Sequence, residues 1–184
     1  MQEGASALPN EPALITRALK EPSAFADLYD AYVGRIYTYV RYRVDDAATA
    51  DDLVAQIFEQ ALVNLKHYQI ERSPFIAWLF GIAHHVVSHH HRVQRHRHMF
   101  SLSADLPLAS AHRLPEEVVI QNETQAELLL AFTKLREHER NLISLKFVAG
   151  LNNRQIAAIT GKSEGSIGIT LFRAMKHLRT LLSE

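Results

Sequence analysis

The sequence predicts an all-α protein built from two small helical domains that are joined by a flexible linker. Apolar residues recur at spacings of three and four through most of the 184-residue chain, which is the period of an amphipathic helix. Strand patterns are scarce. The stretch from about Met99 to Glu117 has prolines, serines and no sustained period. We therefore predict a tail (1–22), a first domain (23–98), a linker (99–120) and a second domain (121–184).

Composition favours a globular protein of the cytoplasm. The apolar fraction of 47% suffices for a core, and no 18-residue apolar run indicates membrane insertion. The N-terminus lacks the basic and apolar regions of a secretory signal. The chain has no cysteine, so disulfides and thiolate metal ligands are excluded. No Ser-His-Asp, Cys-His or paired-carboxylate arrangement indicates an enzyme, and we expect no cofactor.

Three helices are predicted in the first domain, each from its apolar stripe. The first stripe comprises Phe25, Leu28, Tyr32, Ile36 and Tyr39. The second helix has Asp51 and Asp52 at its N-terminal end, where acids are favoured, and its stripe comprises Leu53, Ile57, Ala61 and Leu65. In the third, Ser73 is the expected N-cap before Pro74, and the stripe comprises Phe75, Leu79, Ile82 and Val86.

The polar side of this third helix is rich in histidine. Residues 84–98 contain seven histidines and three arginines but no acid. Charge is also uneven along the chain: residues 1–71 carry eleven acids and six bases, whereas residues 136–184 carry eight bases and four acids. Two basic zones that follow an acidic one suggest two surfaces for a polyanion.

The second domain is predicted to end in a helix-turn-helix. Leu128, Phe132 and Leu135 are in phase on one helix, and Gly150 is the expected C-cap of the next. A short helix then ends at Gly161, and Ser163 can cap a last helix whose inward residues are Ile167, Leu171, Ala174 and Leu178. In such a unit the second helix enters the major groove of DNA.

These segments together resemble one protein family. FADLYDAYVGRIYTYV, ADDLVAQIFEQALVNL, FIAWLFGIAHHV and LREHERNLISLKFVAGLNNRQIAAITGKSEGSIGITLFRAMKHLRTLL are similar to the bacterial sigma factors of the extracytoplasmic-function group, in family order. The resemblance implies that the first domain binds the β′ clamp helices of core RNA polymerase and the promoter -10 element. The second domain would bind the β flap and the -35 element, and an anti-sigma factor would be a further partner.

The resemblance also assigns roles to residues. Those that would bind core polymerase are Asp51, Asp52, Leu53, Gln56 and Glu59, although burial in the core is the stronger expectation for Leu53. The turn from His67 to Ser73 is similar to a loop that captures a flipped base, which needs an apolar wall and hydrogen-bond partners. The expected -10 contacts are Tyr68, Gln69, Arg72 and Ser73, followed by His84, His85, His89, Arg92 and Arg95. Trp78 is expected in the core.

In the second domain the expected -35 contacts are Arg154, Lys162, Ser163, Glu164, Ser166, Ile169, Thr170 and Arg173. Here the chain departs from the family pattern GTVKSRLxRA. It reads GSIGITLFRA, so Gly168 and Thr170 replace basic residues and Ile169 replaces serine. A glycine within a helix costs about 1 kcal/mol relative to alanine, so close approach of DNA or of another helix is expected at Gly168.

Two other functions fit the sequence less well. A stand-alone helix-turn-helix regulator would have no reason to carry DDLVAQIFEQAL and FIAWLFGIA before its reading helix. A histidine metal site lacks the glutamate of the H-E-x-x-H pattern, because His85 and His89 enclose Val-Val-Ser, so we predict no metal.

Protonation of histidines beside phosphate, near their ordinary pKa of about 6.5, would add positive charge. DNA affinity is therefore predicted to rise as pH falls from about 8 to 6. Anisotropy of labelled promoter DNA at constant ionic strength measures this, and a flat profile would contradict it. The alternative for this helix is a solvated face without DNA contact.

Overall fold

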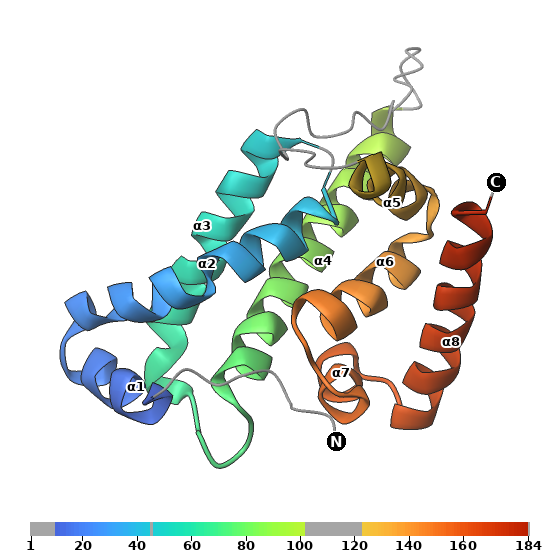
Figure 1. Cartoon of the computed structure of the whole chain (residues 1–184). Coiled ribbons are helices and arrows are strands. Elements are labelled where there is room, and N and C mark those ends of the chain that lie inside the picture. Colours follow the sequence, from blue (N-terminus) through green and yellow to red (C-terminus); the bar gives the residue numbers. More distant parts are fainter. Residues whose placement is uncertain (1–9, 45, 102–122, 184) are drawn as a thin grey trace.

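The computed structural model describes residues 10–44, 46–101 and 123–183, and within these ranges the chain is helical without a strand. The all-α prediction is confirmed. The elements are α1 (Glu11–Lys20), η1 (Pro22–Ala24), α2 (Phe25–Arg41), α3 (Ala47–Asn64), η2 (Leu65–His67), α4 (Phe75–Ser101), α5 (Glu123–Lys134), α6 (Glu137–Ile143), η3 (Ser144–Val148), α7 (Asn153–Thr160) and α8 (Glu164–Leu181). Helices α1 to α4 lie together at one end, and α5 to α8 at the other (Figure 1). The predicted linker lies mostly outside the described residues, and α4 continues through its first three positions.

The first group of helices buries the stripes that the sequence predicted. All five predicted residues of α2 and all four of the α3 stripe are buried. On α4, Phe75, Leu79 and Val86 are buried, whereas Ile82 is half-buried against the same core. Trp78 is likewise partly buried in this core, as expected. Hydrophobic burial of these stripes is what holds the three helices together.

Helix α1 lies within the residues that the sequence assigned to a tail. Its Ile15 and Ala18 are buried, and it packs against α2. Glu11 is buried too, and its carboxylate accepts a hydrogen bond from the hydroxyl of Tyr32. Pro12 in the first turn was a local signal for this helix.

Helix α3 begins earlier than its sequence suggested. Its N-cap is Asp46, whose carboxylate accepts a 2.7 Å hydrogen bond from the backbone N–H of Thr49. Asp51 and Asp52 therefore lie in the second turn and not at the end of the helix. The bond to Thr49 lowers the pKa of Asp46, which is the expected effect of stabilising the charged form.

Replacing Asp46 with alanine is expected to lower the free energy of unfolding by about 1 kcal/mol, because the N–H of Thr49 loses its acceptor. The stabilisation is present above the ordinary aspartate pKa and is lost as pH falls through the lowered value. Urea unfolding at pH 7 measures the change. Asp51→Ala is the control, because Asp51 is a neighbouring exposed acid that does not cap the helix. Equal losses of unfolding free energy in the two variants would contradict the capping role of Asp46.

In the second group of helices, both predicted turn glycines adopt the left-handed conformation, with φ of 66° at Gly150 and 68° at Gly161. Ser163 caps α8 by accepting from the N–H of Ser166 at 3.3 Å. All four predicted inward residues of α8 are buried. On α5, however, Leu128 is 41% exposed although Phe132 and Leu135 are buried, so the predicted stripe is wrong at its first member.

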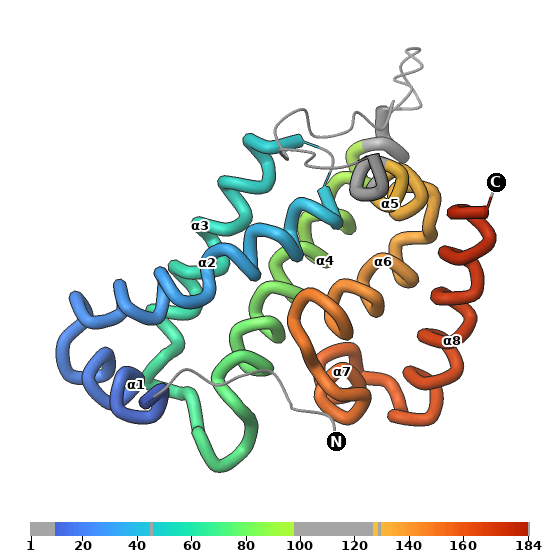
Figure 2. The backbone as a smooth tube through the Cα atoms, viewed as in Figure 1, coloured from blue at the N-terminus to red at the C-terminus, as the bar shows by residue number. Residues whose placement is uncertain are grey.

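The two groups of helices pack directly on each other. Helix α4 lies against α7, and α2 against the π-helical turn η3. Figure 2 shows α4 running between α2 and α3 on one side and α6 and α7 on the other. One apolar cluster continues from α2, α3 and α4 into Leu142, Leu145, Ile156 and Ile167. Arg35 on α2 donates a 2.6 Å hydrogen bond to the carbonyl of Ala149, just after η3. The two domains thus share a core in this arrangement.

Candidate nucleic-acid interface

Four side chains join the two domains through polar contacts, and we call them the interdomain cluster: Tyr39, Arg43, Glu137 and Asn141. The side chain of Arg43 is 1% exposed and lies 3.5 Å from the carboxylate of Glu137. It donates to the Tyr39 hydroxyl at 2.9 Å and to Oδ1 of Asn141, and Tyr39 donates to the same oxygen at 3.0 Å. Burial raises the pKa of Tyr39, so its hydroxyl stays protonated and can donate.

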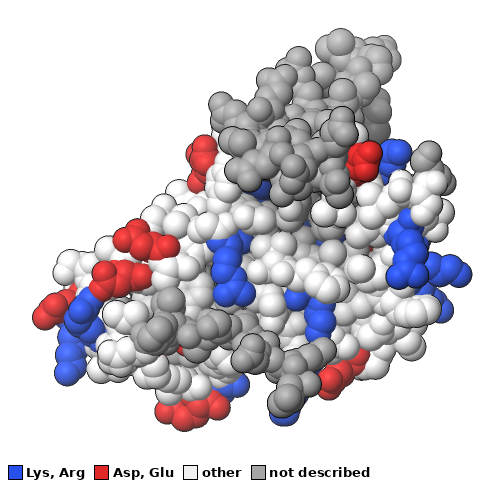
Figure 3. Space-filling model, viewed as in Figure 1, with Lys and Arg blue, Asp and Glu red and all other residues white. Residues whose placement is uncertain are grey.

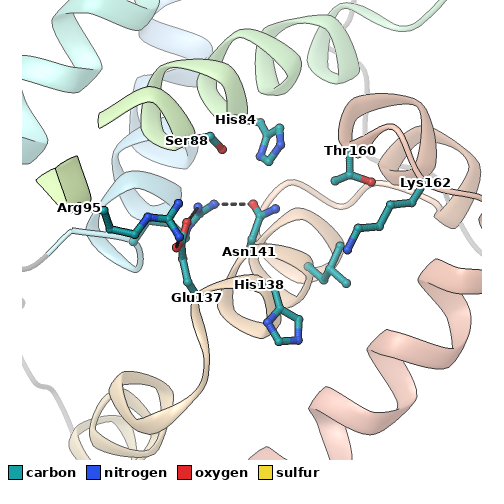
Figure 4. A pocket seen from close by; sticks show the side chains of 10 residues that line it. His84, Ser88, Arg95, Glu137, His138, Asn141, Thr160 and Lys162 are labelled. Carbon is teal, nitrogen blue, oxygen red and sulfur yellow. Dashed lines mark hydrogen bonds and ion pairs between the residues drawn. The ribbon is translucent and has the colours of Figure 1, made fainter. Parts of the chain in front are cut away.

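Beside this cluster lies a cleft of about 450 Å³ between the domains. Figure 4 shows His84 and Ser88 on one side and Lys162 reaching toward it from the turn before α8. Arg95 also lines the cleft, and its guanidinium lies 3.6 Å from Glu137. Two of the expected -10 residues, His84 and Arg95, therefore face the second domain here, together with Lys162 from the expected -35 set.

Of the remaining expected -10 residues of α4, His89 and Arg92 are on the open side of that helix, whereas His85 lines a groove whose opposite wall includes α7 of the second domain. His85, His89 and Arg92 are exposed. A set of three or more His, Cys, Asp or Glu side chains suited to a metal ion is not found in the described part of the chain. This exposed face is available to a large partner such as a DNA backbone.

The loop before α4 is shaped by Tyr68. Its hydroxyl donates a 2.9 Å hydrogen bond to the carbonyl of Ser73, and its ring lies 5.5 Å from that of Phe75 and 5.2 Å from that of Trp78. Burial raises the pKa of Tyr68 to about 12, so the phenol is neutral. Gln69 and Arg72 are exposed. Arg72 and the half-buried Trp78 line one groove, so a polar group and an aromatic ring are available together there, which is the chemistry that an unstacked base requires.

Arg72 and Ser73 line a groove of about 760 Å³ that the other domain closes. Its opposite wall comes from α7 and the residue before it, with Asn152, Arg154 and Gln155. Asn152 and Gln155 form a capping box, in which each side chain accepts from the other's backbone N–H at 2.9 Å. The expected -10 loop and the expected -35 residue Arg154 therefore meet in this one groove.

The outer face of α8 is open. Ser163, Glu164, Ser166, Ile169 and Arg173 are exposed, whereas Thr170 is half-buried and donates to the carbonyl of Ser166 at 2.7 Å. Lys and Arg side chains gather along the edge of the molecule that α8 forms (Figure 3). A Cβ at Gly168 would lie 3.7 Å from the side-chain amide of Asn153, so the close neighbour there is α7.

The residues expected to bind polymerase lie along α3. Asp51, Asp52, Gln56 and Glu59 are exposed, and Leu53 is 4% exposed in the core. The exposed four form an acidic and polar ridge. Leu53 supports this ridge from below and presents almost no surface of its own to a partner.

Two histidines of α4 are packed at the domain contact. Burial, reinforced by Arg43, lowers the pKa of His84, and it lowers that of His91 to about 4. Around them stand Glu137, Asn141 and Arg140 from α6, with His85 and His90 on α4. The predicted gain of charge between pH 8 and 6 is therefore not expected at His84 in this arrangement, and it stays a prediction for the exposed histidines.

The packed arrangement is expected to loosen as pH falls from about 6.5 toward 5, because histidines held neutral by packing protonate more readily once the domains separate. Energy transfer between dyes on α3 and α8, recorded from pH 7.5 to 5, measures this. In the double variant His84→Gln, His91→Gln the efficiency of energy transfer should no longer change with pH. In His89→Gln it should change with pH as in the wild type. If energy transfer in the wild type did not change with pH, His84 and His91 would not control the separation of the domains.

Comparison with known proteins agrees with the geometry. The family model for Sigma-70 region 2 matches residues 28–97, and that for Sigma-70, region 4 matches residues 125–178. The chain is 34% identical over 164 residues to the ECF RNA polymerase sigma factor BldN of Streptomyces coelicolor, covering 89% of this chain and 62% of that protein. It is 30% identical over 159 residues to SigX of Bacillus subtilis, covering 84% of this chain and 81% of SigX.

Two solved structures share the fold. CnrH, in complex with the cytosolic domain of CnrY, superposes with a TM-score of 0.67 at 22% identity over 95% of this chain and 98% of that one. The sigma factor RpoE of Bartonella quintana, in complex with the anti-sigma factor NepR, gives 0.66 at 20% identity over 86% and 96%. No helix within the described ranges is long and apolar enough to cross a membrane. The chain belongs to the extracytoplasmic-function group of the sigma-70 family.

Proposed function

We propose that the chain binds core RNA polymerase and directs promoter-specific initiation, reading the -10 element with the first domain and the -35 element with the second. The open face of α8 is the observation that carries this proposal. A helix-turn-helix whose second helix is capped, supported by a buried stripe and exposed along its outer side is built to enter a major groove. The region 2 domain before it distinguishes the chain from a stand-alone regulator.

In this function the chain works in the cytoplasm by binding polymerase and promoter DNA. It does not act as an enzyme. Core polymerase would be held by the exposed ridge of Asp51, Asp52, Gln56 and Glu59. Acids in this ridge suit a basic partner surface, and charge complementarity raises the rate of association. An anti-sigma factor is a further proposed partner, since RpoE, which shares the fold, was solved in complex with the anti-sigma factor NepR.

Promoter binding requires the two domains to separate. Elements at -10 and -35 are roughly 25 base pairs apart, or about 85 Å along B-DNA. Helix α4, the longest element with 27 residues, spans only about 40 Å. Since the loop at Arg72 and the residue Arg154 line one groove, they cannot reach both elements in the packed arrangement. Polymerase binding would supply the free energy that favours the open state.

A direct test is titration of labelled chain with core polymerase. We expect saturable binding that weakens at least tenfold when Asp52 and Glu59 are both changed to lysine, because the new charges repel a basic surface. Changing the exposed Glu21 and Asp27 of the α1–α2 region to lysine alters the net charge equally and should leave the affinity within about twofold. Equal weakening by both pairs would contradict the α3 ridge as the binding surface.

A further inference from the structure

Apolar side chains stand on the part of α8 where a recognition helix meets base edges. Ile169 is 58% exposed and Phe172, one turn further on, is 73% exposed. Both point away from the core, because the buried side of the helix is formed by Ile167 and Leu171. Residues three apart on a helix are neighbours, so the pair forms one small patch.

Two of the polar groups beside this patch are engaged with the helix itself, whereas the side chains of Ser166 and Arg173, one turn before and after Ile169, are exposed. Thr170 donates its hydroxyl to the carbonyl of Ser166 at 2.7 Å, and Ser163 accepts from the N–H of Ser166. Gly165 and Gly168 have no side chains to offer. A Cβ at Gly165 would meet nothing within 4 Å, so the surface of the helix carries no side chain there and faces open space. Ile169 therefore projects beside the open position of Gly165, four residues before it, whereas Gly168 faces Asn153 of α7.

We propose that Ile169 determines part of the -35 specificity by contacting the C5 methyl group of a thymine in the major groove. The thymine methyl is the apolar group that base pairs present there, and an aliphatic side chain distinguishes it by contact and not by hydrogen bonding. Phe172 lies beside Ile169 and extends the apolar surface along the groove. The proposal rests on the proposed function, because it requires α8 to enter the -35 element.

Replacement of thymine by deoxyuridine tests this contact, since it removes the methyl and keeps every hydrogen-bonding group. A -35 element is first selected from a randomised library with the complete holoenzyme. Each thymine of that element is then replaced singly, and affinity is measured. We expect one or two positions at which binding weakens about three- to tenfold, as loss of a buried methyl contact implies.

The variant Ile169→Ala should bind the thymine element as weakly as the wild type binds the deoxyuridine element, and should be indifferent to the replacement. Met175→Ala, a matched control two turns along α8 and 39% exposed, should keep the sensitivity. An element without thymine, an insensitive wild type, or sensitivity that persists in Ile169→Ala would overturn the methyl contact. Failure to select any common -35 element would overturn the proposed function as well.

Discussion

Replacing Arg43 with alanine is expected to lower the free energy of unfolding by about 3 kcal/mol and to separate the two domains. The side chain of Arg43 is 1% exposed, and it joins Tyr39 of its own domain to Asn141 and Glu137 of the other. Alanine would remove the cationic donor of two buried oxygens: Oδ1 of Asn141 would keep its bond from Tyr39, but the Tyr39 oxygen would lose the donor it has in Arg43, and a buried acceptor without a partner is costly. Glu137 is 35% exposed, so its ion pair contributes the smaller share.

Arg95→Ala is the matched control for this prediction. Arg95 pairs with the same Glu137 at 3.6 Å, but its side chain is 69% exposed. We expect a change below about 1 kcal/mol, as is usual for exposed pairs. Urea unfolding gives the stabilities, and energy transfer between α3 and α8 reports domain separation. Similar losses in the two variants would show that burial of Arg43 does not hold the domains together.

The second large effect is expected in the loop before α4. Arg72→Ala should reduce discrimination at one -10 position by about 5- to 30-fold, because an exposed guanidinium in the groove that Trp78 also lines can hydrogen-bond a single base. Tyr68→Ala should reduce discrimination more broadly, since it also removes the bond to the Ser73 carbonyl that shapes the loop. Affinities of the holoenzyme for a set of single-base -10 variants measure both effects.

Lys66→Ala provides the comparison, since Lys66 is exposed at the end of η2 next to the same loop. A contact of Lys66 with phosphate should weaken all sequences alike. If Arg72→Ala also weakened every -10 variant by one common factor, Arg72 would be a backbone contact and the loop would not read sequence through it. Tyr68→Phe separates the hydroxyl from the ring, and it should retain most of the discrimination.

Local patterns predicted most of the fold because burial follows helical period. The stripes of α2, α3 and α8 depend on neighbours three and four residues apart, and all of their predicted members are buried. The left-handed glycines at 150 and 161 were predictable because few other residues tolerate that conformation. The predicted burial of Leu128 is wrong, because a helical period shows which residues share a face but does not show how far the neighbouring helices cover that face.

Contacts between the domains were beyond sequence reasoning. Arg43 and Asn141 are 98 residues apart in the sequence, and no local sequence motif links the two positions. The burial of His84 and His91 arises from the same packing, so their lowered pKa could not be anticipated from the helix alone. The cap at Asp46 was missed because Asp51 and Asp52 offered a second acidic start five residues later.

The most direct measurement of the central claim is transcription by core polymerase, with and without this chain, from a randomised promoter library. We expect transcripts that depend on the chain and arise from templates sharing two short motifs at -10 and -35. The Arg72→Ala variant should shift the first motif and the Ile169→Ala variant the second. A folded chain that binds core polymerase but enriches no common motif, or that yields transcripts no different from core alone, would contradict the account.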